Sequence, residues 1–252
     1  MSQPTITIEP LTETDLADAR RCNRAAFSAF LGIPEPDLFR PEADVIGPRW
    51  RGWPDGCLAL KANGDLAGVG LMMRWGRVCI LGPLTIFPDY WSHGYARRLM
   101  TDLIEIVDAG GFAFTGLFTH PQSPKHVRLY ESFGFEMQRI TAIMSKVPEA
   151  VGMPPQAALY SVLSDTERSQ ALRDTDTVTA ACFDGLSLRE EIEQIDSERL
   201  GETILLRSGD NVLIELRPRL VVFRGVAVPV LRHDHVVRMV GSPERLGHGD
   251  NS

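Results

Sequence analysis

The chain has 252 residues, of which 44% are hydrophobic and 23% are charged, so it can build a buried core in one large domain or two small ones. The formal net charge of −7 argues against a nucleic-acid partner, because phosphate backbones attract clustered basic residues. The acidity is uneven. Residues 1–147 hold 15 basic and 16 acidic side chains, whereas the remainder holds 11 and 17. An anionic ligand is therefore accommodated more easily in the first part.

The beginning of the chain has neither a basic n-region nor an apolar h-region, which predicts no signal peptide. No apolar run approaches the ~18 residues that a membrane span needs, so we expect no membrane association. The cysteines Cys22, Cys57, Cys79 and Cys182 are scattered and form no CxxC pair, which predicts neither a zinc site nor a disulfide framework. We expect a cytoplasmic protein with reduced thiols.

The first elements follow from hydrophobic periodicity and turn residues. Thr5–Ile8 alternates polar and apolar residues, as a strand does, and Thr12–Asp15 has the residues of a helix start. The helix that follows is expected to end at Gly32. Cys57–Ala62 and Leu66–Trp75 predict a β-hairpin, because Asn63-Gly64 between two apolar runs favours a tight turn.

The next segment predicts a strand, a loop and a helix, followed by alternating elements. Proline cannot donate to a strand ladder, so Gly82-Pro83 predicts a bulge or splay. The predicted elements are a strand at Val78–Phe87, a helix at Gly94–Asp108 with Leu99, Leu103, Ile106 and Val107 on its apolar face, a strand at Ala113–Thr119, a helix at Pro124–Phe133 and a final strand at Phe135–Lys146. This order predicts an α/β fold with a mixed sheet (α+β).

Beyond residue 147 we expect a linker at 148–156, because it contains three prolines and a glycine, then an accessory α/β subdomain at 157–240 and a disordered tail at 241–252. The subdomain is expected to contain a strand at Tyr160–Leu163, helices at Ala171–Phe183 and Leu188–Ile195, a hairpin of Thr203–Leu206 and Val212–Leu216, and an extended segment at Leu220–Leu231. This order repeats that of Thr5–Met73. A degenerate half-copy and an unrelated subdomain are both open interpretations.

The segment Leu84–Met100 is a strand, a loop and a helix start. A loop that opens a helix presents unpaired backbone N–H groups, which with the helix dipole favour a phosphate. Ser92, Gly94 and Ala96 are small enough for close approach to the backbone, and Arg97 and Arg98 lie one turn further on. Taken alone, an ordinary capped helix would explain the same residues.

The loop Trp91-Ser92-His93-Gly94-Tyr95-Ala96 resembles the fingerprint of the GCN5-related N-acetyltransferase (GNAT) superfamily, a strand followed by Gln/Arg-x-x-Gly-x-Gly/Ala. Gly94 and Ala96 match the small positions. Trp91 occupies the Gln/Arg position, which removes a side chain that would help to order the loop.

A second stretch, Ser123–Phe135, is similar to the family's segment Asn-x-x-Ala-x-x-Leu-Tyr-x-x-x-Gly-Phe. Leu129, Tyr130, Gly134 and Phe135 match it, whereas Ser123 stands for Asn and His126 for Ala. The resemblance covers residues 5–147. It implies a GNAT-like acyl-CoA N-acyltransferase fold for residues 1–147, with a smaller C-terminal subdomain that could be a degenerate half-GNAT copy.

The resemblance implies an N-acetyltransferase that moves an acetyl group from acetyl-CoA, its cosubstrate, to a primary amine of a small molecule or peptide, without a metal. The expected contacts to acetyl-CoA are Leu84, Thr85 and Ile86 along the pantetheine arm, the loop residues Trp91, Ser92, His93, Gly94, Tyr95, Ala96 and Arg97 around the phosphates, and Ser123 of the second motif. Tyr130 is the expected acid for the thiolate, with a packing role as its alternative. His120 is the candidate base, with a structural role as its alternative.

Several features remain open in the sequence. Trp50, Trp53, Tyr90 and Trp91 either line a substrate pocket or cover the edge of the core. The acceptor depends on loops such as Gly32–Arg51. His233-Asp234-His235 is a poor metal site, because adjacent side chains of an extended chain point to opposite faces. A homodimer is compatible with the sequence.

Two other functions are considered. One is a non-catalytic module with the same fold that binds or senses acyl-CoA. The other is a nucleotide-binding enzyme of another class. The second is disfavoured because the loop lacks both Gly-x-x-x-x-Gly-Lys-Ser/Thr and Gly-x-Gly-x-x-Gly.

Overall fold

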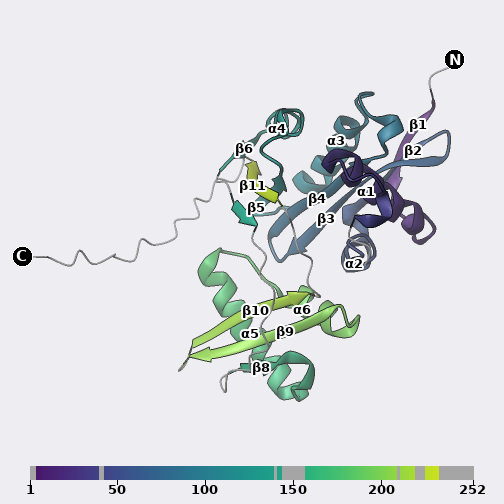
Figure 1. Cartoon of the computed structure of the whole chain (residues 1–252). Helices are drawn as coiled ribbons and strands as arrows, with labels where there is room; N and C mark the ends of the chain where they lie inside the picture. The colour runs from purple at the N-terminus through teal and green to yellow at the C-terminus, as the bar shows by residue number, and fades with distance from the viewer. Residues whose placement is uncertain are drawn as a thin grey trace, which may run out of the picture.

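The computed structural model describes residues 4–39, 43–138, 141–143, 157–208, 211–218 and 225–232. Figure 1 shows a first unit around a large sheet and a second unit, drawn in green, around a small sheet. The predicted linker at 148–156, the tail at 241–252 and the segment His233-Asp234-His235 lie outside the described residues. No helix within the described ranges is long and apolar enough to cross a membrane.

The first unit begins with β1 (Ile6–Pro10), α1 (Leu16–Leu31), α2 (Gly47–Gly52), β2 (Cys57–Ala62) and β3 (Asp65–Trp75). The expected local signals are present. At the start of the first helix the backbone N–H of Thr12 donates to the Asp15 carboxylate at 3.1 Å. Gly32 ends α1 with a φ of 70°, and the β2–β3 turn has positive φ at both Asn63 and Gly64. The predicted helix and hairpin are confirmed.

The unit continues with β4 (Val78–Ile86), α3 (Tyr95–Ala109), β5 (Phe114–Thr119), α4 (Pro124–Glu131), β6 (Phe135–Met137) and β7 (Thr141–Ile143). The strand order is β1-β2-β3-β4-β5-β11-β6, with β7 pairing on β11. All its pairings are antiparallel except that of β4 with β5. This mixed sheet is the predicted fold class.

The interruption predicted at Gly82-Pro83 is a bulge in β4. Gly70 pairs with Leu84 and Met72 with Leu81. The segment of β4 between these pairs is therefore one residue longer than the segment of β3 opposite it, as in a β-bulge. On the other side, β4 pairs with β5 only from Val78 to Leu81. The two strands therefore diverge beyond the bulge and leave a gap beside the C-terminal half of β4.

The sheet is covered on both faces. On one face α3 buries Leu99, Leu103 and Val107, as predicted, but Ile106 is only half-buried and Ile104 is buried instead. On the other face α1 forms a separate cluster with residues of β2 and β3. Each fully buried aliphatic side chain contributes roughly 1.5–3 kcal/mol to the free energy of folding, so these two clusters stabilise the sheet beside the gap.

The strand β11 (Gly225–Arg232) returns from the second unit to the first sheet, where it lies between β5 and β6 (Figure 1). It pairs with β5 at Leu231↔Gly116 and with β6 at Val230↔Met137. The extended segment expected in the accessory subdomain thus completes the first sheet. The predicted strand Phe135–Lys146 consists of β6 and β7, whose pairings on β11 differ by a one-residue shift. Its residues 144–146 lie outside the described ranges.

The second unit contains β8 (Ala157–Leu159), α5 (Asp165–Cys182), α6 (Arg189–Ser197), β9 (Gly201–Ser208) and β10 (Asn211–Pro218). Its antiparallel order β10-β9-β8 has the connectivity of β3-β2-β1 in the first unit, as a half-copy would. The strand predicted at Tyr160–Leu163 was wrong: Tyr160–Val162 is a 3-10 turn. Helix α5 begins earlier than predicted, because Ser164 caps it by accepting from the Glu167 N–H.

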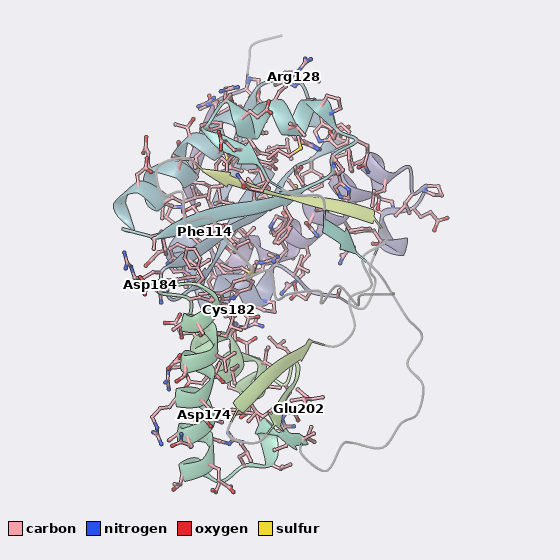
Figure 2. All side chains as sticks on the ribbon, turned by 90° about the vertical axis from the view of Figure 1, so that its left-hand side faces the viewer. Phe114, Arg128, Asp174, Cys182, Asp184 and Glu202 are labelled. Carbon is pink, nitrogen blue, oxygen red and sulfur yellow. The ribbon has the colours of Figure 1, made fainter. Side chains whose placement is uncertain are left out.

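The two units meet at the β3–β4 turn. Arg77 N donates to Gly185 O at 2.7 Å, and the Phe183 and Phe114 rings lie 5.1 Å apart edge to face. Figure 2 shows Cys182 and Asp184, at the end of α5, beside Phe114 of the first sheet. Phe183 is buried among β4 and β5 residues, so the second unit covers the part of the sheet that α1 leaves open.

Candidate active site

The gap beside β4 exposes part of that strand's backbone. The Phe87 N–H bonds to Ala67 O at 2.9 Å, and antiparallel ladders alternate, so Thr85 also directs its backbone to β3. Leu84 and Ile86 direct theirs toward the gap. The side chain of Thr85 is buried against Cys22 of α1. Of the three residues predicted along the pantetheine arm, Leu84 and Ile86 face the gap and Thr85 does not.

The loop after β4 ends in a helix start with unpaired amides. Trp91 N bonds back to Pro88 O, and Arg97 N and Arg98 N bond to Gly94 O. Between them, the amides of residues 92–96 find no acceptor in the described part of the chain. Ser92 and Gly94 have positive φ values of 67° and 78°, which turns the loop into the helix. Unpaired amides at a helix start are the arrangement that the predicted anion site at α3 needs.

The Trp91 side chain helps to order this loop. We had expected the opposite, because Trp91 replaces the Gln or Arg that would help to order the loop in the family pattern. Its indole Nε1 donates to Ile86 O at 2.7 Å, which ties the loop to the end of β4. The Trp91 side chain is 37% exposed, so the ring also forms part of the surface beside the gap. The bond occupies the carbonyl of Ile86, and the N–H of Ile86 remains directed at the gap.

The other predicted loop residues divide by role. The His93 ring stacks on Tyr95 with centroids 5.5 Å apart, and Tyr95, the first residue of α3, is buried in the core, so these two side chains support the loop. Arg97 donates to the Ser132 hydroxyl at 2.7 Å and lies over the Phe133 ring. Arg97 therefore links α3 to the end of α4 through one nitrogen of its guanidinium. Arg98 is exposed on the first turn of α3, and its side chain makes no hydrogen bond or ion pair with another described residue.

Tyr130 lies on α4, on the same side of the sheet as α3. Its ring packs edge to face on Phe135 with centroids 6.4 Å apart. Burial raises the pKa of the Tyr130 phenol to about 12, so the hydroxyl stays protonated at neutral pH. No hydrogen-bond acceptor for this hydroxyl is found among the described residues, which leaves its proton available to a ligand.

His120 follows β5 and contacts α1, which covers the face of the sheet opposite to α3. The ring of Phe30, near the end of α1, lies 5.1 Å from His120 and also 5.1 Å from His126. Burial lowers the pKa of both imidazoles, and for His126 the charge of His120 adds to this effect. Both are therefore neutral at neutral pH, as a base must be. Ser123 is buried between them at the start of α4, where its N–H bonds to His120 O at 3.0 Å.

His126 and Phe30 were not among the predicted site residues. His126 occupies the Ala position of the second motif, and this departure was the only sequence signal for it. Phe30 is one of several apolar residues of α1, and nothing in the sequence distinguishes it from the others. Two of the four loop aromatics for which a pocket role and a core-edge role were open pack at the edge of the core: Trp50 donates to Leu11 O at 2.8 Å, and Trp53 packs on Phe112.

Within the described ranges, no group of three or more His, Cys, Asp or Glu side chains is arranged to hold a metal ion. Burial raises the pKa of Cys22, Cys57 and Cys79 to about 12, so these thiols are protonated and unreactive at neutral pH. Cys182 is exposed.

Comparison with known proteins gives an independent result. Residues 19–135 match the model of the family described as "Acetyltransferase (GNAT) family". No curated protein matches the chain. A crystal structure from Pyrococcus horikoshii, of a protein provisionally named an acetyltransferase, is similar with a TM-score of 0.56 and 16% identity, covering 79% of this chain and 64% of that chain. That likeness shows a shared fold.

Two further solved structures are similar over about half of this chain. PaiA N-acetyltransferase from Thermoplasma acidophilum, in complex with coenzyme A, has 18% identity and a TM-score of 0.47, covering 53% of this chain and 91% of that chain. A GNAT family acetyltransferase from Elizabethkingia anophelis, with acetyl-CoA bound, has 18% identity and a TM-score of 0.41, covering 55% and 80%.

Proposed function

We propose that the protein is an N-acetyltransferase that transfers an acetyl group from acetyl-CoA to a primary amine of a small molecule or peptide, because residues 19–135 match the model of the GNAT acetyltransferase family. The observation that carries the proposal is the row of unpaired amides at residues 92–96, beside the gap between β4 and β5. A phosphate group binds such a helix start without any specific side chain.

The residues present fit this cosubstrate. The Gly94 position has nothing within 4 Å of where a Cβ would lie, so the loop surface is open to a pyrophosphate. Leu84 and the N–H of Ile86 would pair with the amides of the pantetheine arm, as an added strand does. Ser123 lies at the start of α4, near the far side of the gap, and Arg98 supplies positive charge at the rim.

Acetyl-CoA supplies a thioester whose carbonyl carbon is open to attack by an amine. In the transfer a nitrogen–carbon bond forms, the carbon–sulfur bond breaks, the amine loses a proton and the thiolate gains one. Tyr130 donates the proton to the sulfur, because its phenol is protonated and finds no acceptor among the described residues. His120 accepts the proton of the amine, because its burial favours the neutral imidazole.

The placement of these two groups supports the division of roles. Tyr130 packs with the α3 side of the core, whereas His120 contacts Phe30 of α1 on the opposite face. In this proposal the acid approaches a thioester in the gap from the α3 side, and the amine with its base approaches from the side of Phe30.

The alternative is a module that binds acyl-CoA without catalysis. The replacement of the family's Asn by Ser123, which is buried and makes no side-chain cap to α4, favours it. This alternative predicts binding without turnover.

The test has two stages. Acetyl-CoA is first titrated into the protein by calorimetry, and CoA release is then followed with a panel of primary amines. Thiol detection needs an enzyme-only blank, because Cys182 is exposed. We expect binding and amine-dependent release. Binding without release for any amine would favour the sensing module, and no binding would overturn both functions.

A further inference from the structure

A cavity of about 420 Å³ lies where the two units meet, at the opposite end of β4 from the gap. Its volume is that of clefts that hold small organic ligands. The lining residues that matter here come from the turns before β2, between β3 and β4 and between α3 and β5, and from α6: Trp53, Arg74, Arg77, Gly111, Phe112 and Glu190. The cavity is therefore separate from the proposed acetyl-CoA site.

The two arginines of the cavity can bind a ligand. Arg77 is exposed, and its guanidinium makes no hydrogen bond or ion pair with another described residue. Its aliphatic stem lies against Gly185 of the second unit, where a Cβ would come within 3.1 Å of Arg77 Cδ. Arg74 donates to both carboxylate oxygens of Glu190 through Nη2 alone, at 3.1 Å each. Because these two side chains are 40% and 60% exposed, the ion pair is weak and a ligand can compete for Arg74.

Further hydrogen-bond donors line the same cavity. The N–H of Gly110 bonds to the last carbonyls of α3, but the backbone N–H groups of Gly111 and Phe112 bond to no acceptor in the described ranges. The indole nitrogen of Trp53 also has no acceptor there, and it is not buried. Against these donors the lining residues supply one acidic side chain, Glu190. Because unpaired donors and a net positive charge favour a negative group, the cavity is complementary to an anion.

An apolar wall lies beside these donors. The rings of Trp53 and Phe112 pack edge to face with centroids 5.6 Å apart, and the Arg74 guanidinium lies 5.8 Å from the centroid of the Trp53 ring. Phe112 is buried and Trp53 is half-buried. A planar ring of a ligand can therefore pack on these aromatic side chains while its anionic group reaches the arginines.

We propose that this cavity is a second ligand site, which binds a small aromatic carboxylate. The ring packs on Trp53 and Phe112, and Arg74 and Arg77 hold the carboxylate, whose two oxygens match the parallel N–H donors of a guanidinium. Since the lining comes from both units, the bound ligand stabilises their contact, and the Tm of the protein rises with ligand concentration. This inference does not depend on acetyl transfer.

The test titrates indole-3-acetate into the full chain, without CoA, by calorimetry. Tryptamine has the same ring with a positive group, and inorganic phosphate has the negative charge without the ring. We expect a Kd of about 1 mM or tighter for indole-3-acetate, together with a rise in Tm, and binding at least about tenfold weaker for the other two probes.

Two arginine variants show whether the probe occupies this cavity. Arg77→Gln should weaken the binding of indole-3-acetate by about 10- to 100-fold, as the loss of a charge-assisted hydrogen bond predicts. Arg21→Gln is the matched control, because Arg21 is an exposed arginine of α1 that bonds to Asp18 and does not line the cavity. It should keep the wild-type affinity.

A third variant acts in the opposite direction. Glu190→Gln removes the carboxylate that competes for Arg74 and should tighten the binding of indole-3-acetate several-fold. Gly94→Glu should leave this binding unchanged, because the probe does not occupy the loop after β4.

Absence of binding to the wild-type protein would overturn the inference, and so would an affinity that neither Arg77→Gln nor Glu190→Gln changes. Competition with acetyl-CoA, or loss of binding in Gly94→Glu, would place the probe at the loop after β4 and would also overturn it. None of these results bears on the proposed acetyl transfer, which is tested by CoA release.

Discussion

The indole nitrogen of Trp91 donates to the carbonyl oxygen of Ile86 at 2.7 Å, which fastens the phosphate-side loop to the strand that borders the gap. Trp91→Phe keeps the ring and removes the donor. Because a hydrogen bond contributes about 1 kcal/mol net, we expect a loss of about fivefold in acetyl-CoA affinity, measured by calorimetry. Trp50→Phe, which removes an indole donor away from the gap, is the control. An unchanged affinity in Trp91→Phe would show that the loop holds its conformation without this bond.

Two substitutions at Gly94 distinguish the effect of backbone strain from the effect of charge. A Cβ at this position meets nothing within 4 Å, so Gly94→Ala acts only through the positive φ of 78°. We expect this backbone strain to weaken acetyl-CoA binding by roughly 1–2 kcal/mol. Gly94→Glu adds a negative charge beside the unpaired amides and should abolish detectable acetyl-CoA binding. Calorimetry on both variants distinguishes the two effects. Equal affinities for alanine and glutamate would mean that the phosphates bind elsewhere.

Tyr130→Phe tests the acid. The ring still packs on Phe135, so the fold is preserved, and only the proton donor is lost. General acid catalysis contributes typically 10²–10⁴-fold, so kcat should fall by about 100-fold or more while acetyl-CoA affinity changes little. Parallel losses in kcat and in affinity would assign Tyr130 to packing. Because its pKa is raised to about 12, Tyr130 should cause no loss of rate on the alkaline side below about pH 10.

The pH dependence of the reaction tests His120. Burial lowers its pKa below the usual ~6.5, so the neutral, proton-accepting form persists into mildly acidic solution. We expect kcat/KM to fall on the acid side only as the pH passes below ~6.5, and His120→Gln should lower the rate and remove that limb. His126→Gln is the companion variant, since its charge acts on the same cluster. An acid limb that persists in His120→Gln would assign it to another group.

The contact between the two units leads to a prediction about the free energy of unfolding. Phe183 is 7% exposed and packs on Val78, Ile80 and Phe114. Phe183→Ala should lower the free energy of unfolding by about 3–5 kcal/mol, as large aromatic truncations do, measured by denaturant unfolding. Val162→Ala, at a side chain 74% exposed, should stay within about 0.5 kcal/mol. Two separate transitions in Phe183→Ala would show that this contact couples the units.

Local signals in the sequence were sufficient for many of these elements. The Asn63-Gly64 turn, the helix start at Thr12–Asp15 and the bulge at Gly82-Pro83 each depend on a few adjacent residues, and all three are present. The failures were of another kind. Tyr160–Leu163 has apolar residues that suit a strand, but Ser164 caps a helix immediately afterwards, and the chain turns before it.

By itself, the sequence determined the loop and helix start at residues 91–96, because unpaired amides at a helix start follow from chain geometry. The tertiary structure alone decided what surrounds that loop. The contacts of Phe30 with two histidines and the return of β11 to the first sheet join residues distant in the chain, and the bond of Trp91 to Ile86 depends on how the loop packs against β4. Such contacts depend on strand register and on the packing of both units, which no local pattern encodes.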